Sequence, residues 1–583
     1  MESMENNEYK MKFEYEKIKT IVEHLANISN TENLEKTNQI RNDIKYINFK
    51  EWLAKNGAIF EDNFEYPTSF GILNYVGIKS KKSINCNEAL FFIPKSLIID
   101  SNQLRNTSEF KGLFEIADLK GFEKLNVLLI SLFLLKEYIK LINNEFSFWK
   151  SYLDLIDCES LIFWENDLLQ ELDEPNMIEA IKEHRNDLHN YYNKLIIHNV
   201  LNSNEISFTK FATFYSFVLS RNFYVNDNQL LLVPFADALN HNHVSVKYEI
   251  FDSLNYICKH TLYFDDSIKA KNLKRTNNYL FYEQVRETEI VPCSDPDQLN
   301  EESNENYIDL LPHDYFTIST NNQVFKQGEQ VFNFYGEHCN VYLLKWYGFC
   351  YLNNIYDYVT ISLNLPKYED ADFDKYLQLL FEKYLSESII NDEVFNTLSF
   401  NVNSRKINLN LIKYVRFFLY YENDSIEEFL NYQFNIYVEI EVIKRCIELF
   451  KISFENKSKN HKLDDDIQRL KNIYEEYNSI KELDLIKNIR LSNILIFRIS
   501  QKMNILRQIE MCEMILNIYS KALDYVYTNF GNNSNLANEE VLRALNNMDK
   551  IYNFAKDMTL KENKTRLNKY FKSLKLFHYN NQS

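Results

Sequence analysis

The spacing of apolar residues divides the chain into a mixed first part and a helical second part. Between residues 58 and 99, short apolar runs alternate with turns, which is typical of β-strands. From about residue 370 onward, apolar positions recur every three or four residues, the period of a helix with one buried face. The pattern predicts an α+β protein, in which a β-rich part interrupted by helices is followed by an all-α region.

Changes in this pattern predict the segment boundaries. We expect an N-terminal extension with a helix at 1–45, a first β-rich segment at 46–109, a helical insert at 110–210, a second β-rich segment at 211–352 that carries a polar insertion at about 265–312, and a helical region at 366–583. Residues 49–56 should form a short helix that ends at Gly57, because glycine readily adopts the left-handed conformation that follows a helix. The apolar run 127–135 is too short and too closely flanked by charges to span a bilayer, so it predicts a buried helix.

Composition and charge narrow the classes of partner. The chain has 583 residues, of which 45% are hydrophobic, enough to form several cores. Its formal net charge is −18, whereas nucleic-acid binding needs a positive surface that displaces counterions from phosphates. We therefore expect a protein partner and no direct contact with nucleic acid or membrane. Because there are 43 Phe and 40 Tyr residues, a single aromatic residue is a weak signal of function.

The cysteines and the N-terminus indicate an intracellular protein. Eight cysteines are scattered without a C-x-x-C pair or a histidine at zinc-finger spacing, so no metal site is expected and the thiols should be reduced. The first residues, MESMENNEYK, are charged and lack the apolar segment of a secretory signal. We expect a soluble monomer in the cytoplasm or nucleus.

Four segments carry candidate chemistry when they are taken together. They are YVGI at 75–78 with EALFFIP at 88–94, LSRNF at 219–223, PFADALNH at 234–241, and GEQVFNFYGEHCNVYLLKWYGF at 328–349. Each segment alone has an ordinary structural explanation, such as a turn, a strand end or a charge at a helix terminus. Their order and spacing are far more specific than any one of them.

In this order the segments resemble the SET-domain methyltransferases, in the subgroup similar to the Rubisco large-subunit methyltransferase. The resemblance extends from about residue 48 and includes FWKSYLDLID at 148–157. It implies a β-rich SET fold with a knot-like core, a helical insert and a C-terminal helical domain that holds a protein substrate. The implied activity is methyl transfer from S-adenosylmethionine to a protein side chain.

The resemblance also assigns roles to individual residues. It implies that Tyr335 is the catalytic residue and that Phe223 and Phe334 contact the substrate. The residues implied to bind the cofactor are Gly77, Glu88, Leu90, Arg221, Asp237, Asn240, His241, Tyr347 and Phe349. An arginine at 221 suits the cofactor carboxylate, because its planar fork can donate two parallel hydrogen bonds.

The expected chemistry leaves two alternatives to a lysine methyltransferase. Methyl transfer is an in-line displacement that depends on alignment, so no dedicated general base is required, although the acceptor amine must be neutral. An apolar side chain at Phe223 favours the aliphatic stem of lysine over histidine as the acceptor. Tyr75 stands where the family usually has the first glycine of G-x-G, a change that disfavours positive φ there. A histidine methyltransferase, or a binding module with weakened catalysis, therefore remains an alternative.

Overall fold

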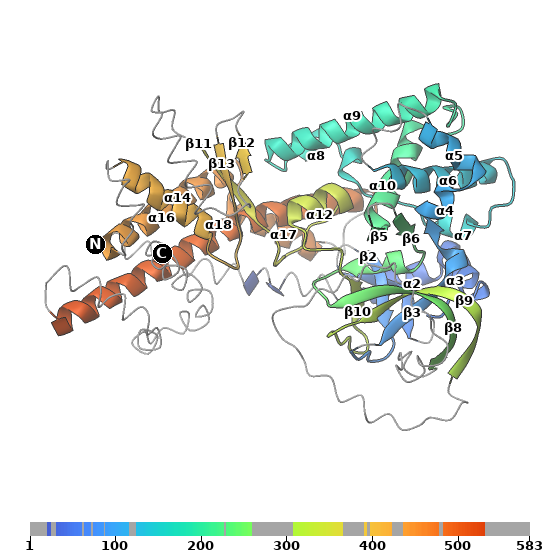
Figure 1. Cartoon of the computed structure of the whole chain (residues 1–583), viewed down its shortest axis with the longest axis horizontal. Coiled ribbons are helices and arrows are strands. Elements are labelled where there is room, and N and C mark those ends of the chain that lie inside the picture. Colours follow the sequence, from blue (N-terminus) through green and yellow to red (C-terminus); the bar gives the residue numbers. More distant parts are fainter. Residues whose placement is uncertain are drawn as a thin grey trace.

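The computed structural model describes most of the chain. The described residues are 20–21, 23–24, 31–60, 63–71, 74–86, 88–115, 124–226, 229–258, 307–364, 390–392, 397–422, 435–476 and 482–530. The protein is α+β: a β-rich part and a helical insert form one end of the molecule, and long helices form the other (Figure 1).

The central sheet joins segments that are far apart in the sequence. Strand β1 (Phe64–Phe70) pairs with β2 (Tyr75–Ser80), β2 pairs with β10 (Gln330–Asn333), and β10 pairs in parallel with β7 (Asn240–His241). The YVGI part of the first candidate segment therefore meets the third and fourth segments in one sheet, whereas EALFFIP lies in another sheet. The resemblance predicted that the third and fourth segments come together. The knot-like threading of the core stays a prediction.

Two further sheets complete the β-rich part. One has the order β3 (Ala89–Pro94), β9 (Tyr307–Thr320), β8 (Val246–Cys258), and the other has the order β4 (Ile99–Asp100), β6 (Gln229–Leu232), β5 (Phe223–Asn226). Most of the polar insertion expected at 265–312 lies outside the described residues. Its predicted end was wrong, since 307–312 already belong to the long strand β9, which pairs with β8.

The helical insert covers the β-rich part (Figure 1). It comprises α4 (Ser101–Arg105), α5 (Ser108–Lys111), α6 (Leu125–Ile142), α7 (Lys150–Leu153), α8 (Asn166–Gln170), α9 (Pro175–Ile197) and α10 (Phe208–Arg221). Most of the apolar run 127–135 is buried in α6, which confirms the buried helix predicted from the sequence. Within the described ranges, no helix is both long and apolar enough to cross a membrane.

The second part of the chain is mainly helical but not all-α. Helix α12 (Asn340–Tyr347) leads to a three-stranded sheet of β11 (Val359–Asn364), β13 (Thr397–Val402) and β12 (Ile390–Asp392). Helices α14 (Leu409–Glu422), α16 (Ile436–Ser458), α17 (Leu463–Glu476) and α18 (Glu482–Phe530) follow. The all-α prediction was wrong at β12 and β13. Their few alternating residues lie beside long helical stretches that dominate the sequence pattern.

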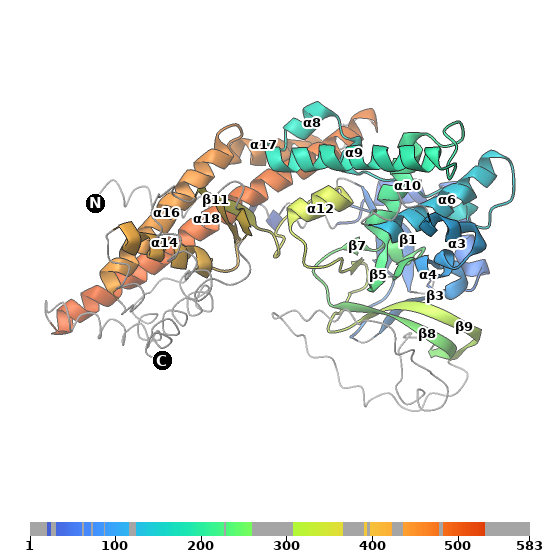
Figure 2. The same cartoon turned by 45° about the horizontal axis from the view of Figure 1, so that its top comes forward.

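Helix α9 links the two hydrophobic cores. Its first half contributes Met177, Ile178 and Ile181 to a core shared with α14, α16 and α18. Its second half contributes Leu188 and Leu195 to the core of the β-rich part. Figures 1 and 2 both show α18 extending from the helical end of the molecule toward α9. The two parts are thus held together by apolar packing on one continuous helix.

Two helices precede the first strand. Helix α2 (Leu34–Arg41) is capped by Asn33 and packs on β1, and α3 (Ile44–Lys55) is capped by Asp43. The predicted helix at 49–56 therefore begins five residues earlier. It ends next to Gly57, as expected, where φ is +88°. The helix expected in 1–45 around 18–25 lies largely outside the described residues, although 20–21 and 23–24 are helical.

The cysteines depart from the prediction at one position. Five described cysteines are free thiols, namely Cys158, Cys339, Cys350, Cys446 and Cys512. Cys86 is disulfide-bonded, so the expectation of uniformly reduced thiols was wrong there. Sequence spacing could not predict this, because distance along the chain does not report which cysteines approach each other in space.

Candidate active site

The parallel pair of β7 and β10 places Tyr335 against the Asn-His segment. In this register Phe332 lies opposite Asn240, and Asn333 lies opposite His241. The backbone N–H of Tyr335 donates to Nδ1 of His241 at 3.1 Å, and the Tyr335 hydroxyl donates to the Leu239 carbonyl at 2.7 Å. Tyr335 is therefore fixed at its backbone and at its phenol by the same three-residue stretch.

Gly77 is closely approached by two side-chain amides. The amide of Asn240 donates to the Val76 carbonyl at 3.1 Å, which holds this segment close to β2. A Cβ on Gly77 would lie 2.6 Å from Nε2 of Gln330 and 2.7 Å from Nδ2 of Asn240. A larger residue would force these amides to shift, and Asn240 would have to move against its hydrogen bond to Val76.

His241 is neutral, and one of its ring nitrogens has no hydrogen-bond partner within the described residues. Burial, together with the neighbouring His243 and His338, lowers the pKa of His241 to about 3, although the Asn333 backbone partly opposes this shift. Because Nδ1 accepts a hydrogen bond from Tyr335, the proton of the neutral ring is assigned to Nε2. Within the described residues this buried Nε2 has no hydrogen-bond partner. A buried donor without an acceptor costs about 1–3 kcal/mol, so an acceptor from a ligand would stabilise this arrangement.

Tyr335 is also neutral and lies among other rings. Burial raises its pKa to about 12, although Arg221 partly opposes this shift. Its ring stacks on Tyr347 at 5.0 Å and lies 5.1 Å from the imidazole of His241. Phe334 and Phe349 lie 5.6 and 6.3 Å from the same imidazole. The predicted residues Tyr335, Tyr347, Phe334 and Phe349 thus form one aromatic cluster around His241.

Arg221 and Asp237 form a charged group beside this cluster. A guanidinium N–H of Arg221 donates to the Asp237 carbonyl at 2.7 Å, and the same nitrogen lies 3.8 Å from the Asp237 carboxylate. That carboxylate accepts the Tyr152 hydroxyl at 2.7 Å. Burial raises the pKa of Asp237, and Arg221 opposes the shift. The Arg221 side chain is 38% exposed, so it keeps donor groups that can face a ligand.

Three of the predicted site residues, Glu88, Leu90 and Phe223, contact groups outside the cluster around Tyr335. The carboxylate of Glu88 accepts from the backbone and the side chain of Asn85. Leu90 is fully buried, at a point where the β3–β9 register shifts. Phe223 packs against Tyr248 and Phe316 in the core, which gives no support to its predicted role as a substrate wall. A buried aromatic residue and a substrate-lining one look alike in a single sequence.

Tyr75 occupies an ordinary strand position. It pairs with Phe70 across β1 and β2, and positive φ angles in the turn between these strands belong to Gly71, at 66°, and Asn74, at 54°. The strain expected at Tyr75 is therefore absent. Its hydroxyl accepts a hydrogen bond from Nδ2 of Asn493 on α18 at 3.2 Å. The Oδ1 atom of Asn493 accepts the backbone N–H of Cys350 at 2.7 Å, next to Phe349.

A buried polar network connects the His243 side of the site to α18. Nε2 of His243 lies 3.2 Å from Oδ1 of Asn354, whose amide donates to Oδ1 of Asn340 at 3.1 Å. The backbone N–H of Asn340 donates to Asp357 at 2.8 Å, and Asp357 also accepts from Ser500 of α18. Burial raises the pKa of Asp357 to about 6. Sequence patterns did not single out Asn354, Asp357 or Asn493, since Asn and Asp are frequent throughout this chain.

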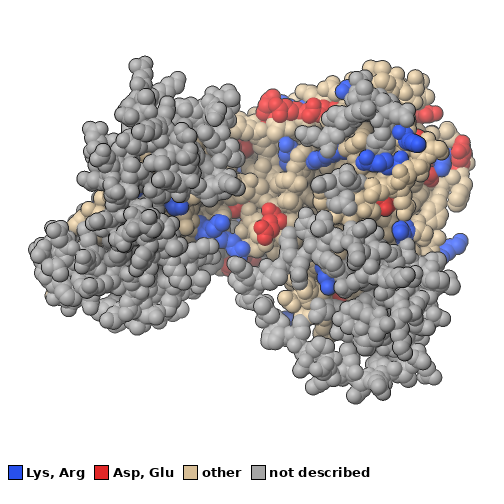
Figure 3. Space-filling model, viewed as in Figure 1, with Lys and Arg blue, Asp and Glu red and all other residues tan. Residues whose placement is uncertain are grey.

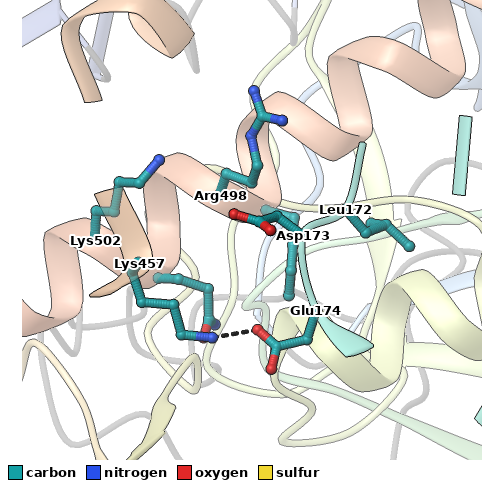
Figure 4. Close-up of a pocket in the computed structure, with 8 residues that line it drawn as sticks. Leu172, Asp173, Glu174, Lys457, Arg498 and Lys502 are labelled. Carbon is teal, nitrogen blue, oxygen red and sulfur yellow. Dashed lines mark hydrogen bonds and ion pairs between the residues drawn. The ribbon is translucent and has the colours of Figure 1, made fainter. Parts of the chain in front are cut away.

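A separate cavity lies at the junction of α9 with α16 and α18 (Figure 4). It is lined by Leu172, Asp173, Glu174, Lys457, Phe497, Arg498, Gln501 and Lys502. Four of its five ionic residues form ion pairs: Lys457 with Glu174, and both Arg498 and Lys502 with Asp466 of α17. The fifth, Asp173, accepts a hydrogen bond from the Asn460 amide at 2.8 Å. None of the predicted site residues lines this cavity.

The chain is similar in its course to solved structures of SET-domain methyltransferases. A SET domain of the Rubisco large-subunit methyltransferase bound to lysine and S-adenosylhomocysteine matches with a TM-score of 0.48, 18% identity, and coverage of 82% of this chain and 92% of that one. The same type of enzyme bound to sinefungin and monomethyllysine matches with a TM-score of 0.49, 18% identity, and coverage of 82% and 94%.

One curated protein gives the comparison at the level of sequence. The chain is similar to the chloroplastic ribulose-1,5-bisphosphate carboxylase/oxygenase large subunit N-methyltransferase of Nicotiana tabacum, with 27% identity over 203 residues. The match spans 33% of this chain and 38% of the relative, well under two thirds of its length. Comparison with protein-family models finds no match. The resemblance predicted from the four segments thus agrees with the curated comparison.

Proposed function

We propose that this protein transfers a methyl group from S-adenosylmethionine to a lysine of another protein. The observation that carries the proposal is the double attachment of Tyr335 to Leu239 and His241, within a cluster of aromatic rings. The sequence similarity to a tobacco N-methyltransferase supports the same reaction class. Both the activity and the acceptor stay proposals, since the matched region covers a minor part of that relative.

The residues present suit the cofactor. S-adenosylmethionine supplies a methyl group activated by a positively charged sulfur. Arg221 would hold its carboxylate through the exposed part of the guanidinium, and the buried Nε2–H of His241 offers a donor that lacks an acceptor within the described chain. The side-chain amides of Asn240 and Gln330 pack against Gly77, so a larger residue there would displace groups next to His241. Phe349 would provide an apolar wall.

The side chains can align and desolvate the reacting groups. The Tyr335 hydroxyl donates a hydrogen bond to the Leu239 carbonyl, so its oxygen lone pairs can accept weak C–H···O contacts from a methyl group. Because Tyr335 and His241 are both neutral, neither adds a negative charge that would hold the acceptor ammonium in its protonated form. Burial among Tyr347, Phe334 and Phe349 lowers the pKa of an amine that enters the cluster.

The ring cluster favours lysine as the acceptor. Aromatic faces accommodate an aliphatic stem and attract ammonium or methylammonium groups through their quadrupoles. Phe223 gives no support to this choice, because its side chain lies in the core. Histidine stays an alternative acceptor.

Incubation with methyl-labelled S-adenosylmethionine and a lysine-containing peptide library, followed by mass-spectrometric site mapping, tests the proposal. We expect labelled lysine, with turnover about 10²-fold lower for Tyr335→Phe because a group positioned for the transition state is lost. Calorimetry should show that this variant still binds S-adenosylmethionine. Tyr437→Phe on α16, where the tyrosine is 47% exposed, is the matched control and should retain full turnover.

Three results would overturn parts of this proposal. Label on histidine alone would replace the acceptor. Full turnover of Tyr335→Phe would remove Tyr335 from the mechanism. Failure of the intact protein to bind S-adenosylmethionine at high micromolar concentration would favour a binding module without catalysis.

A further inference from the structure

A row of aromatic rings leads from Tyr335 to the surface of α12. Tyr335 stacks on Tyr347 at 5.0 Å, Tyr347 lies 6.3 Å from Tyr342, and Tyr342 lies 6.3 Å from Trp346. His338 stacks on Tyr342 at 4.0 Å. Tyr342 is 38% exposed, and Trp346 is partly buried. The row therefore begins at the ring of the candidate catalytic residue and includes Tyr342, which another molecule can reach.

Positive charge gathers at the outer end of this row. The Nζ atoms of Lys124 and Lys345 lie 3.9 and 4.6 Å from the ring centroid of Trp346. His184 of α9 packs edge-on against the same ring at 5.0 Å. Burial and these two lysines lower the pKa of His184 to about 4, so both charges that act on it are positive. Three elements, α9, α12 and the residue before α6, converge on one indole.

This positive charge contrasts with the acidic balance of the chain. The formal net charge is −18, yet Figure 3 shows Lys and Arg side chains gathered on the face below α9. A positive, aromatic surface next to a lysine-directed site suits a segment with negative side chains.

We propose that Tyr342, Trp346, Lys124 and Lys345, here termed the Trp346 surface, bind an acidic segment of the substrate protein beside the acceptor lysine. The proposal rests on the lysine methyltransferase function proposed above and adds the substrate class. Lysine ammonium groups over the indole pair with Asp or Glu, and the ring covers the aliphatic part of the bound segment. An extended chain advances about 3.3 Å per residue, so the acidic residue should lie within about six positions of the lysine.

Peptide binding to the full-length protein tests the Trp346 surface without requiring turnover. The probes are two fluorescein-labelled peptides with one central lysine, which carry either glutamate or glutamine at the positions within six residues of it. We expect about tenfold tighter binding of the glutamate peptide, decreasing as salt is added. The double variant Lys124→Glu with Lys345→Glu should bind both peptides equally or prefer glutamine. Trp346→Ala should weaken the binding of the glutamate peptide.

The control and the contrary results separate this proposal from the proposed function. Lys451→Glu, an exposed charge reversal on α16, should keep the full preference for glutamate. Thermal melting checks that each variant is folded. Equal binding of the two peptides by the unaltered protein, or an undiminished preference in the double variant, overturns the Trp346 surface while lysine methylation can still hold. Absence of S-adenosylmethionine binding overturns the methyltransferase proposal, while an acidic preference would still stand as a binding property.

Discussion

Two regions of the protein contain buried polar groups with different surroundings. One is the contact of Tyr335 with Leu239, Asn240 and His241, here termed the Tyr335 corner. The other is the set of ion pairs around the cavity of Figure 4, formed by Asp466, Arg498, Lys502, Lys457 and Glu174, here termed the charged junction. At the corner, Tyr335 and His241 are neutral and a buried N–H of His241 has no acceptor within the described residues. At the junction, Asp466 is 1% exposed and pairs with both Arg498 and Lys502, which are 4% and 1% exposed. The buried charges of the junction have partners within the protein, whereas Nε2 of His241 lacks one among the described residues, as a donor in a ligand site can.

The junction instead fastens the helical insert to the second part of the chain. Arg498 of α18 donates to the Glu171 carbonyl at 2.7 Å, just before α9 begins. Lys457 of α16 pairs with Glu174, the residue that precedes α9. The cavity of Figure 4 therefore lies at a structural contact between the helical insert and helices α16 and α18. The chemistry is indicated by unsatisfied donors, a glycine without room for a side chain, and neutral titratable groups.

The largest effect is expected from breaking the junction. Asp466→Asn leaves Lys502 buried without its carboxylate and leaves Arg498 with Glu171 alone, which should lower the free energy of unfolding by about 3–5 kcal/mol. Urea denaturation at pH 7.5 measures it. Asp464→Asn, an exposed position on the same helix, is the control and should change little. A small loss for Asp466→Asn would mean that the ion pairs of Asp466 contribute little to the stability of the folded protein.

Gly77→Ala should damage the corner. The added methyl would meet two amides at 2.6 and 2.7 Å, and overpacking of this kind costs about 1–3 kcal/mol. The affinity for S-adenosylmethionine should fall about tenfold or more, as measured by calorimetry. Gly112→Ala is the matched control, because nothing lies within 4 Å of its Cβ position and its φ is −65°. Unchanged affinity in Gly77→Ala would separate this glycine from cofactor binding.

The neutral state of His241 predicts acid sensitivity. Its pKa is about 3 in the folded protein against an ordinary value of 6.5, so the unfolded chain takes up the proton first. The resulting contribution to the free energy of unfolding is fully present above pH 6.5 and is lost as pH falls toward 3. At pH 5 the loss is about 2 kcal/mol. Urea denaturation at pH 7.5 and pH 5 measures the loss. His241→Gln should reduce the difference, and an unchanged difference would assign the proton uptake to other groups, such as His184.

The sequence predicted the site better where roles depend on backbone segments than where they depend on burial. The four segments placed Tyr335, Asn240 and His241 together, and strand pairing between β7 and β10 brings them into contact. Phe223 was assigned to the substrate wall although it packs in the core. The sequence pattern cannot tell which face of a short strand is buried when two successive residues, here Phe223 and Tyr224, are both aromatic.

Elements of the fold with strong local sequence signals were also predicted better than elements that depend on distant contacts. The buried helix at 127–135 and the helix end at Gly57 were predicted, because a long apolar run and a glycine after a helix are strong local signals. Strands β12 and β13 were missed because three to six residues between helical stretches leave little periodicity. Asn493 and Asp357 could not be found, since their importance arises from contacts more than 140 residues away along the chain.

The smallest effect concerns the contact through which α18 reaches the corner. Tyr75→Phe removes the hydroxyl that accepts from Asn493, whose amide still donates to the Ile489 carbonyl at 3.0 Å. We therefore expect a loss of only about 1 kcal/mol in the free energy of unfolding, measured in urea. Asn493→Ala should cost more, because the buried N–H of Cys350 then loses its acceptor.

A double-mutant cycle isolates the Tyr75–Asn493 contact. Tyr75→Phe should have almost no further effect in the Asn493→Ala background, which gives a coupling energy of about 1 kcal/mol.

Tyr75→Gly tests the family pattern directly. Because β2 is an ordinary strand at this position and its phenol contacts α18, restoring glycine should weaken both stability and cofactor affinity. Tighter binding of S-adenosylmethionine by Tyr75→Gly would show instead that the tyrosine obstructs the cofactor, and that α18 contributes nothing to the corner through this residue.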